Sequence, residues 1–514
     1  MTAELIKIAA VKPEERFSTL LAPGPSNIIN VLNQVPGFGM SGIENRPIEL
    51  QAIMLPNAKI RYAGNKSVDP GLAGQWFQTA HKFVTMPPVP HPTAGYRYAV
   101  MVVVGHRDRG VDGRTKDQIT QFFKDFDREA ASVGVKLTNG GSMLEVEDDR
   151  GEIANKVNML KNAGARLAFV VMTSPDGDSY GRIKLAADPC GFPTQCLKLR
   201  RVCEPPKGYH TNVMLKVNTK LGGTNHTLTS RLAPNTTPPK GYQDPPKSLS
   251  WVFEKPSMMV GIDVSHPDRG RSEGQSLAAV VGSVNRSCSQ YIAHIRSQAA
   301  GQEIVSTLCE AMETLFDSFR RKNGCMPAHV LVYRDGVGDG QFAEVLQDEL
   351  GQIQEAVRRQ GSGPEDVKIS IVVCQKRHST RLVYRGEGSD VENLCPGIVA
   401  DASQGDDSIS SANHIEFYLN SHISIQGTAK PCKYSLIHDE IGFKLSELEL
   451  LTYWTCYLYC RCNRSVSLAT PAYYAHWASK RARILFRAGA TPDDLVEISK
   501  AWSADNALAT MFFV

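Results

Sequence analysis

Apolar runs alternate with amphipathic stretches in the middle of this chain, and their spacing predicts a parallel α/β unit. Two continuous apolar runs, 98–105 and 165–172, have the pattern of strands that are buried on both faces. Helical patterns separate and follow these runs, at about 116–133, 151–163, from 178 onward and around 208–219. Because strands that alternate with helices favour a parallel sheet, we expect a Rossmann-like domain here, with a ligand site beyond the carboxyl ends of the strands.

The pattern between residue 250 and the end of the chain predicts a second α/β unit with another element order. Three strand-like runs, 258–264, 276–284 and 290–295, are close enough to form an antiparallel meander. A helix, a strand, a helix and a strand follow, at 302–322, 329–335, 341–358 and 367–374. This order is typical of a ribonuclease H-like domain. The hydrophilic stretch 385–414 is expected to be a surface loop, and helices at 445–462 and 470–486 complete the unit.

Proline-rich stretches separate the parts of the chain. Residues 1–95 are rich in Pro, Gly and Asn and indicate an extended linker with a few strands. The stretches 86–95 and 231–248 cannot continue a helix or a central strand, because clustered prolines lack amide donors. We therefore expect a linker over 1–95, one domain over 96–235 and another over 250–514.

Composition excludes some classes of protein and leaves others open. A hydrophobic content of 42% and a charged content of 21% are those of an ordinary globular protein. No apolar run approaches the roughly 20 residues needed to cross a bilayer, so no membrane association is expected. The start of the chain has no secretory signal, so the 12 cysteines are expected to be reduced thiols in a cytoplasmic or nuclear protein. The net charge of +4 alone does not identify a nucleic-acid-binding protein.

Two aspartates in the last segment are candidates for metal binding. Asp263 ends the first strand and Asp335 ends the fourth, and these strands are neighbours in a sheet of this order. A carboxylate in a hydrophobic strand is costly unless it has a partner. Clustered carboxylate oxygens suit Mg²⁺ or Mn²⁺, and two such ions about 4 Å apart hold water and leaving oxygen in line across a phosphodiester. The alternative is that each aspartate only caps a turn, which GIDVSHPDRG and YRDGVGDG both allow.

Longer motifs add a resemblance to a known family. Residues 251–514 contain, in order, VGIDVSHP, SLAAVVGSV, GQEIV, VYRDGVGDGQF, QKRHSTRL, IQGT, SVSLATPAYYAHWASKRAR and MFFV. This region resembles the PIWI domain of eukaryotic Argonautes over its whole length. The segments SYGRIKLAADPCGFPTQCLK and TNVMLKVNTKLGGTNHTL resemble the Argonaute Mid domain. The resemblance implies a linker, a Mid domain over 96–235 and a PIWI domain over 250–514. No N-terminal or PAZ domain is recognisable, so we expect the C-terminal half of an Argonaute.

The resemblance implies a catalytic, metal-binding tetrad of Asp263, Glu303, Asp335 and His476 that holds two Mg²⁺ (or Mn²⁺) ions. GQEIV identifies Glu303, although a glutamate in the first turn of a helix is also favoured by the helix dipole. Glu310 and Glu313 are weaker rivals, because they fit the exposed face of the same helix. His476 lies in PAYYAH, and without the resemblance it would be interpreted as an ordinary helix histidine.

The resemblance also implies residues that bind a 5′-phosphorylated guide RNA. Tyr180 would stack on the first base, and the other residues expected at the guide 5′ end are Lys184, Gln195, Lys216, Lys220, Arg481 and Tyr473. Tyr180 and Lys184 lie one helical turn apart near a helix start, where amide groups favour an anion. Contacts to the guide backbone map onto Lys376, Arg377, Arg381, His422, Gln426, Thr428, Lys430, Arg461 and Ser467. A single lysine of this kind is usually only a solvated surface residue.

The sequence therefore predicts a small-RNA-guided endoribonuclease of RNA silencing, which cleaves a paired target RNA and leaves a 3′-hydroxyl and a 5′-phosphate. Silencing-complex proteins are further expected partners. Two alternatives stay open. One is a catalytically silent guide-binding module that recruits partners, and the other is a guide-free ribonuclease H-like nuclease.

Overall fold

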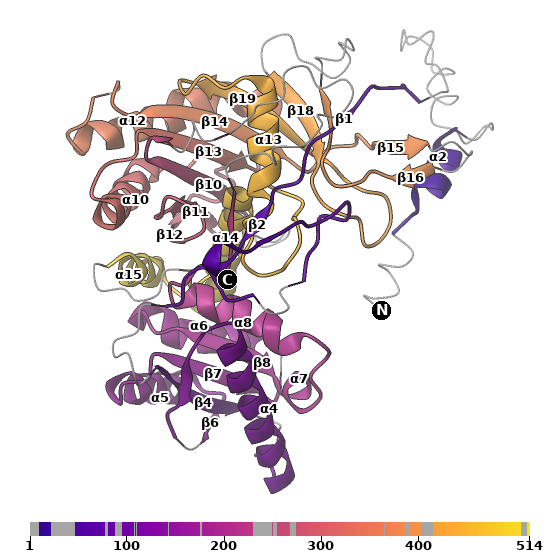
Figure 1. The fold of residues 1–514 in the computed structure, drawn as a ribbon. Coiled ribbons are helices and arrows are strands. Elements are labelled where there is room, and N and C mark those ends of the chain that lie inside the picture. Colours follow the sequence, from indigo (N-terminus) through magenta and orange to yellow (C-terminus); the bar gives the residue numbers. More distant parts are fainter. Residues whose placement is uncertain are drawn as a thin grey trace, which may run out of the picture.

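Two separate sheets, each covered by helices on both faces, form most of the molecule in this computed structural model (Figure 1). The structure describes residues 10–21, 47–77, 81–87, 95–106, 108, 110–141, 143–174, 177–229, 249, 254–267, 274–363, 365–385, 391–401, 415–504 and 511–514. The predicted α/β fold is confirmed. Within these ranges, no helix is long and apolar enough to cross a membrane.

The first sheet is parallel, as the alternation of strands and helices predicts. Its strands are β4 (Tyr96–Val104), β5 (Leu137–Asn139), β6 (Leu144–Glu147), β7 (Leu167–Met172) and β8 (Thr194–Lys198). Val102 and Phe169 pack on one face against α4 (Gly113–Ser132) and α8 (Tyr209–Lys220). Met101 and Val170 pack on the other face against α5 (Arg150–Asn162) and α6 (Gly177–Ala187). Burial on both faces explains why β4 and β7 are continuous apolar runs.

The second sheet has nine strands, in the order β1-β17-β18-β19-β14-β13-β10-β11-β12. Their bounds are β1 (Ile53–Met54), β17 (Ile398–Asp401), β18 (Ile415–Asn420), β19 (Cys432–Asp439), β14 (Lys368–Gln375), β13 (His329–Asp335), β10 (Ser257–Ser265), β11 (Ser276–Ser283) and β12 (Tyr291–Gln298). Strands β10, β11 and β12 form the predicted antiparallel meander, and β10 pairs in parallel with β13. The first and fourth strands of this unit are therefore neighbours, as expected.

Helices cover both faces of the nine-stranded sheet. On one face, α10 (Leu308–Asn323) and α12 (Leu350–Arg359) pack on Val260 and Val332. On the other face lie α13 (Leu445–Thr455), α14 (Thr470–Arg487) and α15 (Pro492–Ser503). Helix α14 also contacts α6, and α15 contacts the short 3₁₀ turn η2 (Asp188–Cys190), so both helices join the sheet to the first unit.

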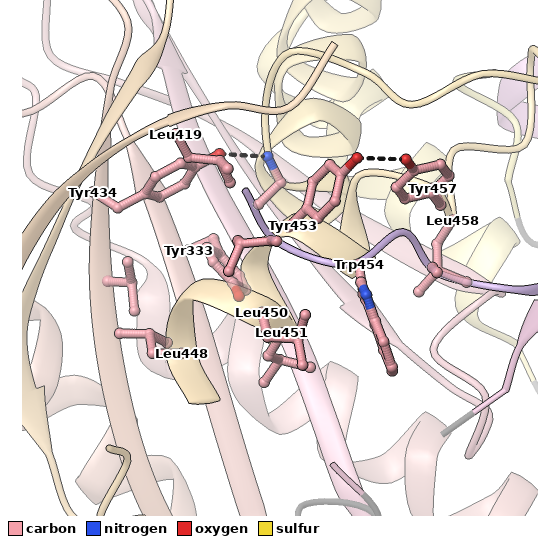
Figure 2. Packing of buried hydrophobic residues seen from close by; sticks show 14 of the residues in the cluster. Tyr333, Leu419, Tyr434, Leu448, Leu450, Leu451, Tyr453, Trp454, Tyr457 and Leu458 are labelled. Atoms are coloured by element: carbon pink, nitrogen blue, oxygen red, sulfur yellow. Dashed lines mark hydrogen bonds between the residues drawn. The ribbon is translucent and has the colours of Figure 1, made fainter. Parts of the chain in front are cut away.

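An aromatic cluster between α13 and the sheet fixes the start of α14 (Figure 2). The hydroxyl of Tyr434 on β19 accepts a hydrogen bond of 3.0 Å from the amide of Ala469, the residue that caps α14. Tyr453 and Tyr457 share a hydroxyl–hydroxyl hydrogen bond of 2.6 Å in the same cluster. Because these hydroxyls are buried with partners, the cluster combines apolar packing with a directional contact that orients α14.

The remaining elements are short. They are α2 (Pro13–Leu21), β2 (Ile60–Arg61), η1 (Ala63–Asn65), β3 (Ser67–Val68), α7 (Leu199–Cys203), β9 (Thr227–Leu228), η3 (Asp339–Gln341), α11 (Phe342–Glu344), a π-helical turn (Val345–Glu349), β15 (Val383–Arg385) and β16 (Val391–Asn393). Strand β2 pairs with both β3 and β9, while β1 adds an edge to the nine-stranded sheet. Residues 53–68 therefore take part in two sheets.

Several predicted boundaries are wrong. Helix α10 begins at Leu308 and not at residue 302, because residues 302–307 form an irregular loop held by distant side chains. Helix α13 ends at Thr455, short of the expected 462. The expected loop 385–414 contains β16 and β17, and α15 is a third C-terminal helix that was not expected. The proline-rich stretch 231–248 lies outside the described residues.

Candidate active site and basic cavity

Two carboxylates lie side by side near the ends of β10 and β13. The two strands pair up to Ile262 and Arg334, and Asp263 and Asp335 are the next residues. Burial, together with the negative charge of Asp263, raises the pKa of Asp335 to about 7. Two like charges taken out of water repel each other, and a cation placed beside both would relieve that repulsion.

Helix α14 brings a histidine and a serine to Asp263. The Nδ1 atom of His476 lies 3.5 Å from Asp263 Oδ2, and the Ser479 hydroxyl donates to the same oxygen at 2.5 Å. Although burial opposes ionisation of Asp263, the hydrogen bonds from His476 and Ser479 outweigh it and lower the pKa of this carboxyl. The hydrogen bond with Asp263 in turn raises the pKa of His476, whose side chain is 48% exposed. His476 thus has one side on the carboxylate and the other toward solvent.

A glycine in β10 allows α14 to approach this closely. A Cβ atom on Gly261 would lie 2.0 Å from the Pro471 carbonyl oxygen in the first turn of α14. Real Cβ atoms do not approach backbone oxygens to this distance, so any side chain would push the helix away from the strand. The absence of a side chain at Gly261 therefore sets the distance between Asp263 and the residues that α14 presents.

Glu303 lies in the loop between β12 and α10 and adjoins Asp335. Its Oε1 accepts from Arg334 Nη1 at 2.8 Å, and its Oε2 is 2.7 Å from His266 Nε2. A Cβ atom on Gly336, the residue after Asp335, would lie 2.8 Å from Glu303 Oε1. The carboxylate of Glu303 is thus next to the backbone that carries Asp335.

The structure therefore brings the four tetrad candidates to one end of the nine-stranded sheet. His476 contacts Asp263, Asp263 adjoins Asp335, and Glu303 packs beside Gly336. Within the described ranges, however, no three His, Cys, Asp or Glu side chains are close enough to form a set of metal ligands. The Glu303 carboxylate is directed toward Arg334 and His266, so the four donors are neighbours without meeting at a common point.

A cavity of about 260 Å³ between the two sheets gathers most of the predicted guide 5′-end residues. Its predicted lining residues are Tyr180, Lys184, Gln195, Lys216, Lys220 and Arg481. Arg461, which sequence reasoning gave to the guide backbone, also lines it, together with Cys196, Trp477, Lys480, Ile484, Phe513 and Val514. Tyr473 is not among the lining residues. Its ring packs on Tyr459 with the ring centres 4.8 Å apart.

Hydrogen bonds across the cavity join the first unit to α14. Arg481 donates to Asp188 Oδ2 and to the Tyr180 hydroxyl, each at 2.8 Å. On the other wall, Lys220 Nζ donates to Gln195 Oε1 at 2.9 Å, and Lys184 Nζ donates to the Thr194 carbonyl at 2.9 Å. These five lining side chains are therefore held by hydrogen bonds within the protein.

The cavity holds more positive charge than its own residues neutralise. Burial and the nearby Lys184, Arg481 and Lys216 hold the pKa of Lys220 well below its usual range. Burial, with a contribution from Arg461, lowers the pKa of Lys216 to about 8. Of the arginines and lysines named here, Arg481 alone has a carboxylate partner among the described residues. That partner is Asp188. Mutual repulsion of buried cations is relieved by an anion, so this cavity is suited to a phosphate group.

Apart from Arg461, the residues predicted on the guide backbone form two groups outside the cavity. In the first, Lys376 Nζ donates to the Ser467 hydroxyl, and burial together with Lys376 lowers the pKa of His422 to about 4. In the second, burial and the charges of Arg381 and Arg377 lower the pKa of Lys430.

Helix α2 borders the second of these groups. Thr428 accepts a 3.0 Å hydrogen bond from Arg16 of α2 and donates at 2.9 Å to the carbonyl of Val11. Gln426, two residues before Thr428, is exposed to solvent. The N-terminal segment thus contacts the surface on which the backbone contacts were predicted.

Comparison with known proteins decides the family. The model of the Piwi domain matches residues 167–487, which is more than half of the chain. The chain belongs to the Argonaute family. It is 31% identical over 472 residues to protein argonaute 5 of Arabidopsis thaliana, covering 87% of this chain and 44% of that protein. It is 28% identical over 515 residues to the Schizosaccharomyces pombe argonaute, covering 97% and 57%. This Argonaute chain therefore spans about half the length of the curated relatives it matches.

Solved Argonaute structures share the fold. A Kluyveromyces polysporus Argonaute with a guide RNA matches with a TM-score of 0.79 at 21% identity, over 100% of this chain and 58% of that one. The C-terminal lobe of a budding yeast Argonaute matches with a TM-score of 0.75 at 21% identity, over 90% and 95%. These similarities confirm the predicted fold class, a Rossmann-like Mid domain followed by a ribonuclease H-like PIWI domain.

Sequence reasoning on this Argonaute chain missed residues that only the fold brings to the sites. Ser479 and His266 each follow a tetrad residue by three positions, which is the one local signal that the sequence offers. Trp477 and Lys480 line the cavity from α14, where the Arg461 guanidinium lies 4.1 Å from the centre of the Trp477 ring. Arg16 lies more than 400 residues from its partner Thr428, so no sequence pattern could connect them.

Proposed function

We propose that this chain is a small-RNA-guided endoribonuclease that cleaves a paired target RNA with divalent metal ions. The observation that carries the proposal is the pair Asp263 and Asp335 on neighbouring strands, with His476 and Glu303 at the same end of the sheet. A basic cavity between the two units is lined by most of the residues expected to bind a guide 5′ end. The Kluyveromyces polysporus Argonaute, which has the same fold, was solved with a guide RNA.

The donors at the sheet end fit a pair of Mg²⁺ or Mn²⁺ ions. Carboxylate oxygens are the preferred ligands of these hard cations, and imidazole binds Mn²⁺ as well. Burial and the neighbouring charge of Asp263 raise the pKa of Asp335, so a cation beside both carboxylates would favour their ionised forms. Asp263, Asp335, Glu303 and His476 would hold the ions. When bound, two such ions activate water and stabilise the leaving oxygen of an in-line displacement.

The chain's own residues would bind and orient the two RNA strands. Lys184, Lys216 and Lys220 would neutralise the guide 5′-phosphate, while Tyr180 would stack on its first base. The two groups outside the cavity would contact backbone phosphates of the guide. Phosphate contacts position a strand without reading it, so base pairing with the guide selects the target. Silencing-complex proteins as partners and a cytoplasmic or nuclear location belong to the same proposal.

A second candidate function, guide binding without cleavage, is favoured by one observation. Glu303 is held by Arg334 and His266, and in the described part of the chain no three donors form a set of metal ligands. A protein in which this arrangement persists with RNA bound would hold a guide and target without cutting. Its silencing activity would then depend on recruited proteins.

A cleavage assay separates these functions. The chain is loaded with a 5′-phosphorylated guide, and a complementary labelled RNA is added with Mg²⁺, with Mn²⁺ or with a chelator. The proposal predicts metal-dependent cuts opposite the middle of the guide, with 3′-hydroxyl and 5′-phosphate ends. Stable target binding without cuts would support the silent module, and cutting that ignores the guide would support a guide-free nuclease.

A further inference from the structure

The loop that carries Glu303 is held by two side chains from the helical stretch that ends in α12. Glu349 Oε1 accepts from the amide of Val305 at 3.0 Å, and Glu349 is only 1% exposed. Gln352 donates to the Val305 carbonyl at 2.8 Å and accepts from the amide of Leu308 at 2.9 Å. Side chains three residues apart lie on one helix face, so Glu349 and Gln352 clamp the loop together.

Glu349 also binds the arginine that holds Glu303. Arg334 Nε lies 3.1 and 2.9 Å from the two carboxylate oxygens of Glu349, and Nη2 donates to Oε1 at 2.9 Å. Arg334 is fully buried, and it donates at 2.8 Å to Glu303 Oε1 and at 2.7 Å to the Glu303 carbonyl. A single buried carboxylate thus supports both the backbone and the side chain of the Glu303 loop.

The charges of this network leave Glu303 negative. A forked guanidinium–carboxylate contact is the strongest ion pair available to an arginine, and Glu349 provides it for Arg334. Because Glu349 already neutralises Arg334, the trio of Glu303, Arg334 and Glu349 has a net charge of about −1 when all are ionised. Without Glu349, Glu303 would be the one carboxylate left in contact with Arg334 among the described residues, and the two opposite charges would cancel.

The local backbone is specialised where Glu349 lies. Residues Val345–Glu349 form a π-helical turn between α11 and α12, and Glu349 is its last residue. A π turn rotates the following residues around the helix axis relative to an α-helix, and such turns are frequent at functional sites. This turn directs Glu349 and Gln352 toward the loop and not toward solvent.

We propose that Glu349 is a positioning residue of the nuclease centre, which anchors the Glu303 loop and, by neutralising Arg334, leaves the Glu303 side of this network with net negative charge for a cation. Gln352 anchors the other end of the same loop. This inference rests on the proposed metal-dependent function, because only there does a negative Glu303 beside Asp335 have a role.

The experiment compares variants of the full chain by Mn²⁺ titration and by hydrogen exchange of residues 303–309. Glu349→Gln retains an oxygen for the Val305 amide but removes the charge. Exchange should stay slow in this variant, while Mn²⁺ binding weakens about 10- to 100-fold, the usual effect of losing a residue that supports a metal ligand. Glu349→Ala and Gln352→Leu should instead speed exchange of the loop amides. Glu355→Gln, on the exposed face of α12, is the matched control and should change neither.

The outcomes separate this inference from the function on which it rests. The Mn²⁺ binding that is present in wild type and lost in Asp263→Asn is assigned to the nuclease centre. If wild type and Asp263→Asn bind Mn²⁺ equally, the metal-dependent function is wrong. If that binding depends on Asp263 but Glu349→Gln leaves it unchanged, the role of Glu349 is wrong. Unchanged hydrogen exchange of the loop in both Gln352→Leu and Glu349→Ala would also show that the proposed anchoring is wrong. If Glu349→Ala does not fold, Gln352→Leu alone provides this test.

Discussion

Raising the pH should weaken binding of a 5′-phosphorylated guide, because one lysine of the basic cavity loses its charge near pH 8. Burial, with a contribution from Arg461, lowers the pKa of Lys216 to about 8. A bound phosphate favours the charged lysine, so binding above this pH requires uptake of a proton. The phosphate itself is already ionised above about pH 6. The contribution of Lys216 to affinity is therefore fully present below pH 7 and is lost as the pH rises through 8.

The size of the effect follows from the fraction of Lys216 that is charged. With a pKa of about 8, Lys216 is about nine-tenths protonated at pH 7 and about one-tenth protonated at pH 9. If the lysine is charged in the complex, guide affinity falls about tenfold between these two pH values. Lys220 also has a lowered pKa, so the part due to Lys216 is the difference between wild type and Lys216→Arg.

Equilibrium binding of labelled guides with a 5′-phosphate or a 5′-hydroxyl, measured from pH 7 to 9, tests this prediction. Lys216→Arg keeps its charge throughout and should lose this part of the pH dependence. Lys216→Met should also lose it, and should bind more weakly at pH 7. A wild-type pH dependence that is the same for the 5′-hydroxyl guide, or that persists unchanged in Lys216→Met, would show that Lys216 and the 5′-phosphate do not cause it.

Three further perturbations test other parts of the structure. Gly261→Ala places a Cβ about 2 Å from a backbone oxygen of α14 and should lower the free energy of unfolding, measured by urea denaturation, by at least about 1–3 kcal/mol. Gly338→Ala, in open space, should lower it by less than about 0.5 kcal/mol. Asp188→Asn leaves the buried Arg481 without its counter-charge, so the same measurement should show a loss of about 3 kcal/mol; an unchanged midpoint would contradict the contact. Ser479→Ala removes the hydrogen bond to Asp263 and should weaken Mn²⁺ binding about 10-fold or more without changing guide affinity.

The elements that the sequence predicted best are those whose pattern reflects burial on both faces. Strands β4, β7, β10 and β13 are continuous apolar runs because helices cover both sides of each sheet. Strand β17 was interpreted as loop because it lies near one edge, where it pairs with β1 more than 340 residues away. Helix α15 was missed although Thr491 and Asp494 form a capping box before its apolar face.

In the candidate site, too, local sequence signals predicted some features, whereas contacts between distant residues determine others. Asp263 and Asp335 could be paired from the strand order, because parallel neighbours end at the same edge. The conformation of the Glu303 loop could not be predicted, because hydrogen bonds from Glu349 and Gln352 hold residues that the local pattern places at the start of a helix. The cavity was expected residue by residue from the resemblance. Its charge balance, however, depends on Asp188, which lies within the Mid segment SYGRIKLAADPCGFPTQCLK but is not among the residues expected at the guide 5′ end.

Single-turnover cleavage by Asp335→Asn is the decisive test of metal-dependent catalysis at the end of the nine-stranded sheet. This variant keeps the size of the side chain but removes a charge from the proposed metal centre. Wild type and variant are loaded to equal occupancy with one 5′-phosphorylated guide and given the same target in Mn²⁺. If Asp335 holds a catalytic metal ion, target binding should be equal and the cleavage rate of the variant at least about 100-fold lower. Cleavage at the wild-type rate would contradict this role of Asp335.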